Sequence, residues 1–405
     1  MSTNSEPSWA APDAPAAYPP ASGASPDAVP KGRRSRARRE PGYGQAPKAA
    51  SGSSYPGTGP LPSSSELRRE AQRTARIAAR TTSPEEDVER ARALLKRVTS
   101  TFSERVVGQQ RLRVALVSCL IAGGHVLLES VPGLAKTTAA QTLAAAVSGS
   151  FRRIQCTPDL MPNDIVGTQI YSYETGKFTT QLGPVHANVV LLDEINRSSA
   201  KTQSAMLEAM QEHQVTIGEQ TFTLPDPFLV MATQNPIEQE GTYALPEAQV
   251  DRFMLKVVID YPTLEEEKLV IRENLQETMP VVHPVISANE ILEARRVVKD
   301  VYIDDKIMQY IADIVFATRY PERYQLPELK QMITFGGSPR ASINLAKASR
   351  AYAFIKHRGY VVPEDVRAVA HDVLRHRIGL SYEAEATDLT TEKIISEIIN
   401  KIQVP

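Results

Sequence analysis

A lysine and a threonine follow a short loop near residue 130, and residue types with this spacing can bind a phosphate. An apolar run, residues 126–128, leads into the loop, and Lys136 and Thr137 then open an alanine-rich stretch. A strand, a tight loop and a helix N-terminus point backbone N–H groups at an anion. Lys136 would neutralise phosphate charge, and the Thr137 hydroxyl would hold a magnesium ion. Ser130 and Ala135 stand where the phosphate-loop pattern has glycine, so the stretch alone is equally consistent with a strand–loop–helix turn that binds nothing.

Two adjacent carboxylates, Asp193 and Glu194, end the apolar run 189–192. Carboxylates at the end of a buried strand are costly unless they meet cations or water. Downstream of a phosphate loop, Asp193 would orient magnesium and Glu194 would polarise the water that attacks the terminal phosphate. The alternative is a pair of solvated carboxylates where the strand emerges.

An amide and an arginine stand where further phosphate contacts are needed. Asn235 follows the apolar run 228–232, and Pro236 holds it extended, so that its amide projects beyond the sheet edge. It could sense the terminal phosphate or the attacking water, or simply form a turn. Arg340 lies in the first turn of a helix that begins at Ser338-Pro339, where a cation opposes the helix dipole. Phosphate contact would explain Arg340; an ordinary surface arginine is the alternative.

Short apolar runs alternate with helical segments up to residue 262, which predicts a parallel sheet with helices on both faces and ligands at the carboxyl ends of its strands. Expected strands are 126–128, 151–154, 189–192 and 228–232, and expected helices are 111–122, 139–147 and 198–214. After residue 262 the pattern is helical. Expected helices there are 264–277, 287–298, 304–318, 339–356, 363–375 and 391–403.

The composition of the 405-residue chain indicates how it divides into domains and which partners its N-terminal segment could bind. Residues 1–65 are rich in Pro, Ala, Ser and Gly, which predicts a disordered tail. Its basic run, 31–39, is interpreted as a solvated segment, with an arm for nucleic acid or anionic membrane as the alternative. We expect a helical segment at 66–103, an α/β domain at 104–262 and a helical domain at 263–405.

The whole-chain charge and the apolar runs exclude some classes of protein. A formal net charge of −1 argues against a surface built for nucleic acid. No apolar run reaches the length of about 20 residues that a membrane span needs, and we expect a cytoplasmic protein. The isolated Cys119 and Cys156 are interpreted as core residues of a reducing compartment.

Several motifs in order make residues 106–405 resemble the MoxR family of AAA+ ATPases. The motifs are Val107-Gly108-Gln109, Gly124-His125-Val126-Leu127-Leu128-Glu129, Val131-Pro132-Gly133-Leu134-Ala135-Lys136-Thr137, Thr157-Pro158-Asp159-Leu160-Met161-Pro162, Asp164-Ile165-Val166-Gly167, Leu192-Asp193-Glu194-Ile195-Asn196-Arg197, Met231-Ala232-Thr233-Gln234-Asn235-Pro236, Leu245-Pro246-Glu247-Ala248-Gln249, Asp251-Arg252-Phe253 and Ser338-Pro339-Arg340-Ala341. In this family Ala135 is usual, whereas Ser130 departs from the usual glycine and is expected to alter affinity without abolishing binding.

The resemblance implies a fold and a set of roles. The fold would be an α/β P-loop core of three layers with a parallel sheet, followed by an all-α lid. ATP and Mg²⁺ would be the ligands, with Thr137 and Asp193 at the metal and Gly108 and Gln109 at the adenine. The expected phosphate-loop residues are Ser130, Val131, Pro132, Gly133, Leu134, Ala135, Lys136, Thr137 and Thr138. The expected catalytic residues are Glu194, Asn235 as first sensor, Arg340 as second sensor and Arg252, supplied to a neighbouring subunit.

The resemblance also implies a ring, most simply a hexamer, that uses ATP hydrolysis to remodel, mature or assemble a client protein, often with a von Willebrand A-domain partner. Residues 160–182 and 214–227 match inserts that would face a partner or a central pore. Two alternatives remain from the residues: a regulator that binds ATP with little turnover, and a motor stimulated by nucleic acid through the basic tail.

Overall fold

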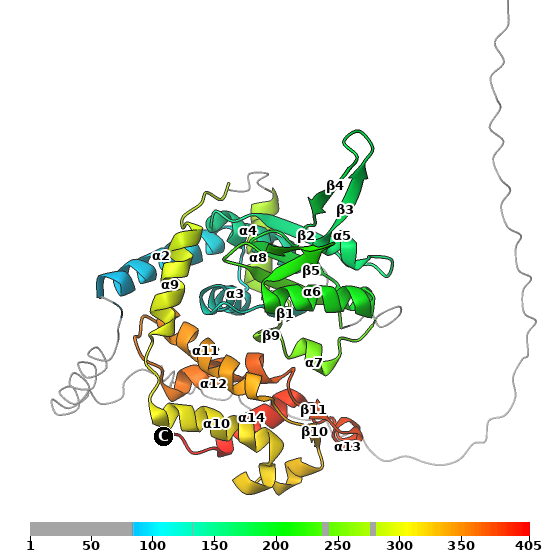
Figure 1. The fold of residues 1–405 in the computed structure, drawn as a ribbon. Helices are drawn as coiled ribbons and strands as arrows, with labels where there is room; N and C mark the ends of the chain where they lie inside the picture. The colour runs from blue at the N-terminus through cyan, green and yellow to red at the C-terminus, as the bar shows by residue number, and fades with distance from the viewer. Residues whose placement is uncertain (1–82, 84, 132, 237–242, 276–280) are drawn as a thin grey trace, which may run out of the picture. The chain divides into compact units, whose positions relative to one another are not determined.

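A five-stranded parallel sheet forms the centre of the first part of the protein (Figure 1). The computed structural model describes residues 83, 85–131, 133–236, 243–275 and 281–405. The strand order is β2-β5-β8-β1-β9. The strands are β1 (Val126–Glu129), β2 (Phe151–Gln155), β5 (Val189–Asp193), β8 (Leu229–Gln234) and β9 (Leu255–Val258). The four expected strands are confirmed, and β9 is an addition that the sequence analysis did not predict.

Helices cover both faces of this sheet, as the apolar strands require. All five residues of β5 are buried, which is typical of a parallel strand between two helical layers. Leu128 of β1 packs in one apolar cluster with α3 (Gln110–Ala122) and α4 (Lys136–Ala146). Its neighbour Leu127 points to the opposite face, into a second cluster with α6 (Ala200–Glu212). The predicted three-layer α/β core is confirmed.

The strand register brings polar residues, among them the predicted Asp193, to the carboxyl ends of the strands. Glu129 at the end of β1 lies opposite Gln234 at the end of β8, and Asp193 at the end of β5 lies opposite Gln155 of β2. The phosphate loop leaves β1, so it begins beside these residues. The candidate site therefore lies at the carboxyl ends of the parallel strands.

Two β-hairpins extend this α/β part. The first follows α5 (Pro162–Val166) and consists of β3 (Gly167–Ser172) and β4 (Lys177–Leu182), which project from the sheet (Figure 1). The second consists of β6 (Gln214–Ile217) and β7 (Gln220–Thr223) and precedes β8. Both fall within the segments expected to be inserts. A 3-10 turn η1 (Ile195–Arg197) follows β5, and α7 (Glu247–Val250) precedes β9.

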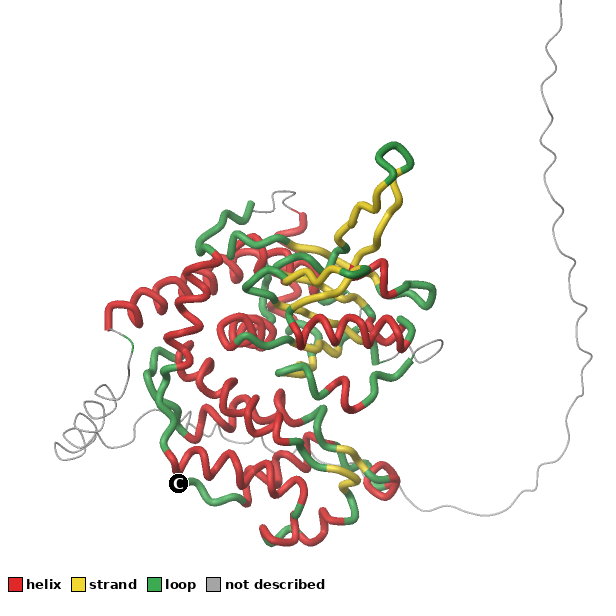
Figure 2. The backbone as a smooth tube through the Cα atoms, viewed as in Figure 1, coloured by secondary structure: helices red, strands yellow, loops and turns green. Residues whose placement is uncertain are grey.

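The second part is mainly helical, as expected (Figure 2). Its helices are α8 (Leu264–Leu275), α9 (Ala288–Lys299), α10 (Asp305–Arg319), α11 (Pro339–Ile355), α12 (Pro363–Leu374), α13 (Tyr382–Ala386) and α14 (Thr391–Lys401), with 3-10 turns η2 (Pro321–Tyr324) and η3 (Pro327–Lys330). Ser338 accepts a hydrogen bond from the Arg340 N–H and so caps α11. A short antiparallel pair, β10 (Ile333–Phe335) and β11 (Gly379–Leu380), was not predicted.

Apolar packing is continuous between the two parts. The helix α2 (Glu85–Arg105) packs on α4 and α9, and α3 packs on α9 and α11. One buried cluster includes residues of all these helices. The domain boundaries near residues 103 and 262 stay predictions. The expected tail, residues 1–65, its basic run, 31–39, and residues 66–82 lie outside the described residues.

Two features bear on the expectations for the whole chain. Among the helices that the structure describes, none combines the length and the apolar character that crossing a bilayer demands. Cys119 and Cys156 are both buried and free, and burial raises the pKa of the Cys156 thiol to about 12.

Candidate nucleotide-binding and hydrolysis site

The phosphate loop presents an uncapped helix N-terminus. Gly133 has φ 85° and Ala135, the residue before α4, has φ 52°. Among the residues that the structure describes, no side chain caps the first N–H groups of α4. Uncapped N–H groups at a helix start carry partial positive charge and bind anions. Leu134 is buried and anchors the loop, whereas Pro132, also expected in the loop, lies outside the described residues.

Lys136, the first residue of α4, reaches back over the loop. Its Nζ donates to the carbonyl of Val131 at 3.4 Å. Burial lowers the pKa of Lys136, and the carboxylates of Asp193 and Glu194 oppose that change. The ammonium group is therefore near enough to both predicted acidic residues for their charges to act on it. Thr137 and Thr138 follow it in the first turn of α4.

Ser130 occupies its position without backbone strain. Its φ is not among the positive values found in the described residues, so this position does not need glycine. The side chain is buried, and its Oγ donates to the Val131 carbonyl at 3.2 Å. The serine therefore fills the place of the usual glycine and adds a bond inside the loop.

Asp193 is held by residues of both neighbouring strands. The Nε and Nη2 atoms of Arg153 on β2 lie 3.1 and 2.5 Å from its Oδ2 atom. The Thr233 hydroxyl on β8 donates to its Oδ1 atom at 2.7 Å. The carboxylate is buried, and these contacts are what a buried charge requires.

Glu194 follows Asp193 in a left-handed conformation, with φ 58°. Its Oε2 atom accepts from Gln155 Nε2 and from Arg197 Nη1, both at 3.1 Å. A left-handed non-glycine residue stores strain, which the surrounding contacts must hold in place. The carboxylate of Glu194 is thereby aimed by β2 and by the turn that follows β5.

Thr233 connects these two acidic residues and was missed as a functional residue. Its hydroxyl accepts from the Glu194 backbone N–H at 2.8 Å while it donates to Asp193. Arg153, Gln155 and Arg197 were missed as well. The register of β2, β5 and β8 brings Arg153, Gln155 and Thr233 to the predicted acids, whereas Arg197 lies only three residues after Glu194. For Gln155 and Thr233, a polar residue at or near the end of a strand was the available signal.

Asn235 is buried immediately after β8, beside a pocket of about 340 Å³. Gln234, next to it, donates to Glu129 at 3.0 Å, and Lys256 of β9 lies 2.7 Å from the same carboxylate oxygen. Polar contacts therefore join the ends of β1 and β8 to the Lys256 side chain of β9. His376, from the helical part, also lines the pocket.

Gly108 and Gln109 form a left-handed turn before α3, with φ 65° and 48°. A Cβ added to Gly108 would lie 2.5 Å from the Glu266 carboxylate of α8. Glycine thus suits this turn because of its positive φ, whereas the Glu266 carboxylate is the end of a flexible side chain and could move aside.

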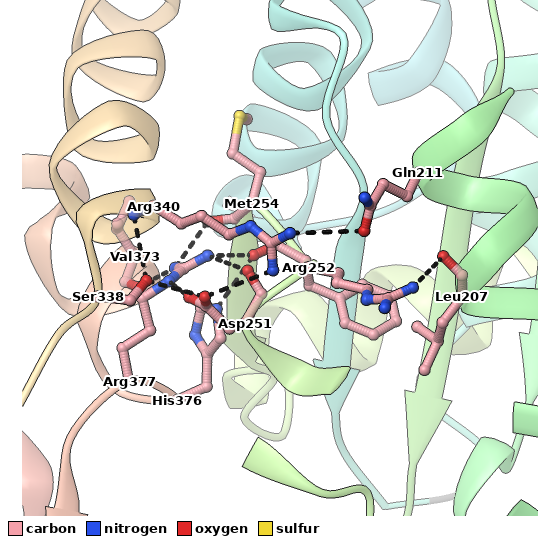
Figure 3. Close-up of polar contacts among 11 residues, drawn as sticks. Leu207, Gln211, Asp251, Arg252, Met254, Ser338, Arg340, Val373, His376 and Arg377 are labelled. Carbon is pink, nitrogen blue, oxygen red and sulfur yellow. Dashed lines mark hydrogen bonds and ion pairs between the residues drawn. The ribbon is translucent and has the colours of Figure 1, made fainter. Parts of the chain in front are cut away.

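Arg252 and Arg340 lie together, against α6 (Figure 3). Arg252 Nη1 donates to the Leu207 carbonyl at 2.9 Å, and Arg340 Nη2 donates to Gln211 Oε1 at 3.4 Å. Leu207 and Gln211 are one helical turn apart. Within the described residues, neither arginine has a polar contact with the phosphate loop. Both arginines therefore contact neighbouring turns of α6.

The residues around Asp193 fit a magnesium ion that keeps part of its water shell. A carboxylate offers about four lone-pair positions, and the bonds from Arg153 and Thr233 leave one open. Mg²⁺ in phosphate-transfer sites retains waters and takes few protein ligands. Asp193 and Thr137 could hold such an ion through water and hydroxyl oxygens.

Comparison with known proteins agrees with this geometry. The family described as "ATPase family associated with various cellular activities (AAA)" matches residues 125–255, and "AAA lid domain" matches residues 328–398.

Relatives match over most of the chain. It is 46% identical over 311 residues to "Chaperone MoxR1" of Mycobacterium tuberculosis, covering 77% of this chain and 82% of that protein. It is 44% identical over 315 residues to YeaC of Bacillus subtilis, covering 77% of this chain and 95% of that protein. A solved structure from Cytophaga hutchinsonii shares 48% identity with a TM-score of 0.76, covering 79% of this chain and 98% of that one.

Proposed function

The chain belongs to the MoxR family of AAA+ ATPases, and from that premise we propose that it hydrolyses ATP to remodel, mature or assemble a client protein. One observation carries the proposal. The uncapped N-terminus of α4 and the ammonium of Lys136 face the acidic residues Asp193 and Glu194. A site for a polyphosphate thus lies next to groups that can activate water.

Each residue of this site has a task in phosphoryl transfer. The loop N–H groups and Lys136 bind the phosphates and offset the charge that develops on them. Glu194 orients the attacking water and accepts its proton, from a position set by Gln155 and Arg197. Asn235 contacts the terminal phosphate or that water. A magnesium ion at Thr137 and Asp193 would supply positive charge to the phosphate oxygens.

Arg252 and Arg340 complete the site of a neighbouring subunit. Both contact α6, and Arg252 forms no ion pair among the described residues, so it is available to an anion. Such an arginine raises phosphoryl-transfer rates by about 10³- to 10⁵-fold. Because Arg340 lies with Arg252, we assign both to the same neighbouring nucleotide. Head-to-tail sharing of sites closes into a ring, for which we propose a hexamer.

The client and its adaptor are proposed on the family premise. One relative is named "Chaperone MoxR1", which supports a chaperone-like role here. Hydrolysis would move subunits against one another and so act on a bound protein, with a von Willebrand A-domain protein as a partner. The hairpin β3–β4 exposes Tyr173 and Phe178 and offers a surface for that contact.

The test of the activity is the substitution Glu194→Gln. We expect ATP binding to be retained and turnover to be lost, because the amide cannot accept a proton from water. Steady-state phosphate release and nucleotide titration measure the two properties. Unchanged slow turnover in the variant would favour an ATP-binding regulator instead. If turnover is lost as expected, the variant can be purified in the presence of ATP. A client protein trapped on it would then co-purify and could be identified.

A further inference from the structure

Arg377 of the helical part is buried against the segment that carries Arg252 (Figure 3). It lies between α12 and β11, and only 3% of its surface is exposed. The segment, residues 251–254, connects α7 to β9 in the α/β part. A side chain of one part is thus embedded in a functional loop of the other.

The guanidinium of Arg377 uses its whole donor set. Its Nε donates to Asp251 Oδ1 at 2.6 Å. Nη2 donates to the main-chain carbonyls of Asp251 at 2.9 Å and Phe253 at 2.5 Å. Nη1 donates to the carbonyls of Met254, at 3.4 Å, and Val373. Arginine has five N–H donors in a rigid fork, and most of these hold the backbone of residues 251–254.

Asp251 receives a second contact from the helical part. Ser338, at the start of α11, donates to its Oδ2 atom at 2.9 Å, and Arg340 Nη1 lies 3.8 Å from the same oxygen. A buried arginine is stable only when its charge and donors are matched. Asp251 therefore ties the segment to two places in the helical part.

Arg252 itself has little to fix its side chain. Its guanidinium makes one described hydrogen bond, to the Leu207 carbonyl, and its Nε is buried without a hydrogen-bond partner in the described part of the chain. Its direction thus depends on the backbone on either side of it. That backbone is the one held by Arg377.

We infer that Arg377 is a positioning residue for Arg252, through which the helical part of one subunit aims the arginine delivered to its neighbour's nucleotide. The inference rests on the proposed function, in which Arg252 acts on a neighbouring subunit. A misplacement of about 1 Å can cost about 10²-fold in rate. The fork of Arg377 is the contact that prevents it.

The first experiment is the substitution Arg377→Lys. Lysine keeps the charge but cannot reproduce a planar fork of donors. We expect kcat to fall about 10²-fold while the KM for ATP stays unchanged, because the variant's own phosphate loop is intact. Arg358→Lys is the matched control, since Arg358 pairs with Asp365 inside the helical part. It should retain kcat. Full kcat in Arg377→Lys would overturn the inference.

Mixed rings separate positioning from a general structural role. Subunits with Glu194→Gln cannot hydrolyse ATP but still supply Arg252. Mixing them with Arg377→Lys subunits should restore turnover at the Arg377→Lys sites. Mixing Arg377→Lys with Arg252→Ala should restore nothing, because both fail to supply the arginine. Asp251→Asn weakens the same contact and should behave like Arg377→Lys. It replaces Arg377→Lys in these experiments if the Arg377→Lys protein does not fold.

The outcomes distinguish two failures. If Arg252→Ala is not rescued by Glu194→Gln, the shared site of the proposed function is wrong. If Arg252→Ala is rescued but neither Arg377→Lys nor Asp251→Asn is, Arg377 does not act through Arg252. Rescue of Arg377→Lys by Arg252→Ala would also overturn the inference.

Discussion

The hydroxyl of Thr233 joins the two acidic residues of the site, since it donates to Asp193 and accepts from the Glu194 N–H. Thr233→Val keeps the shape of the side chain and removes its hydrogen bonds to Asp193 Oδ1 and to the Glu194 N–H. We expect a loss of about 1–3 kcal/mol in the free energy of unfolding. We also expect kcat to fall about tenfold, which corresponds to about 1.4 kcal/mol, because the Glu194 backbone loses its anchor.

Chemical denaturation and steady-state phosphate release measure these two effects. Thr233→Ser is the control, because it keeps the hydroxyl and should keep most of the activity. Wild-type turnover in Thr233→Val would mean that Arg153 and Gln155 suffice to position the acidic pair.

Ser130 replaces the usual glycine of the family, and the structure indicates how little this changes. Its hydroxyl stays inside the loop, on the Val131 carbonyl. Ser130→Gly removes that bond and adds backbone freedom of about 0.5–1 kcal/mol, which must be lost on ordering. We expect ATP to bind about two- to fivefold more weakly, with kcat retained. Isothermal titration with ATP measures the affinity; complete loss of binding would show that the serine is essential.

Residue types alone pointed to candidate residues whose chemistry is unusual for their place in the chain. Each of these residues carries a charge that is costly at its position unless a counter-charge or a ligand is near. They are Lys136 after a loop, Asp193-Glu194 after a buried strand and Arg340 at a helix start. Arg153 and Thr233 gave no such signal, because an arginine or threonine at a strand is ordinary. Their contacts arise from pairing between strands far apart in the sequence, which local reasoning cannot supply.

At the scale of elements, the length and the burial of each helix or strand decided whether its position could be predicted from the sequence. The strand β5 and the helices α10 and α11 have long or fully buried patterns, and their predicted positions agree to within a few residues. The strand β9 was missed because it is short and includes Lys256. β10 and β11 are shorter still, and only their mutual pairing makes them strands.

His125, just before β1, connects three elements through its buried ring. Nδ1 accepts from the Val230 N–H on β8 at 3.0 Å, so Nε2 carries the proton and donates to the Met210 carbonyl of α6 at 3.1 Å. Burial lowers the pKa of His125 to about 4. The neutral ring is therefore part of the folded state.

The folded protein should lose stability as the pH falls from about 6.5 to about 4. In this range the unfolded chain binds a proton at His125 and the folded chain does not, so acid favours unfolding, by up to about 3 kcal/mol. Urea denaturation at pH 5 and pH 7 measures the slope. His125→Gln should reduce it but not abolish it, because burial lowers the pKa of His376 in the same direction. An unchanged slope would exclude His125 as its source.

At the scale of the whole molecule, the described residues divide the chemistry between two surfaces. Lys136, Asp193 and Glu194 lie at the phosphate loop, whereas Arg252 and Arg340 lie against α6, apart from that loop in all their described contacts. The role of Arg340 as second sensor stays a prediction, because Ser338-Pro339-Arg340 identifies only a residue type and a helix start. The contact of Arg340 with α6 depends on how the helical part packs on the α/β part, which local sequence patterns do not show.

A site divided in this way should make activity depend on assembly. We expect the ATPase rate per subunit to rise with protein concentration and to level off once rings are complete, because each phosphate loop then meets a neighbour's Arg252. Arg252→Ala should remain at the low rate at every concentration while still assembling. Phosphate release across a dilution series, with light scattering for mass, measures both. A constant rate per subunit across the range in which the mass changes would mean that each chain hydrolyses ATP alone, and that Arg252 and Arg340 serve another purpose on the surface of α6.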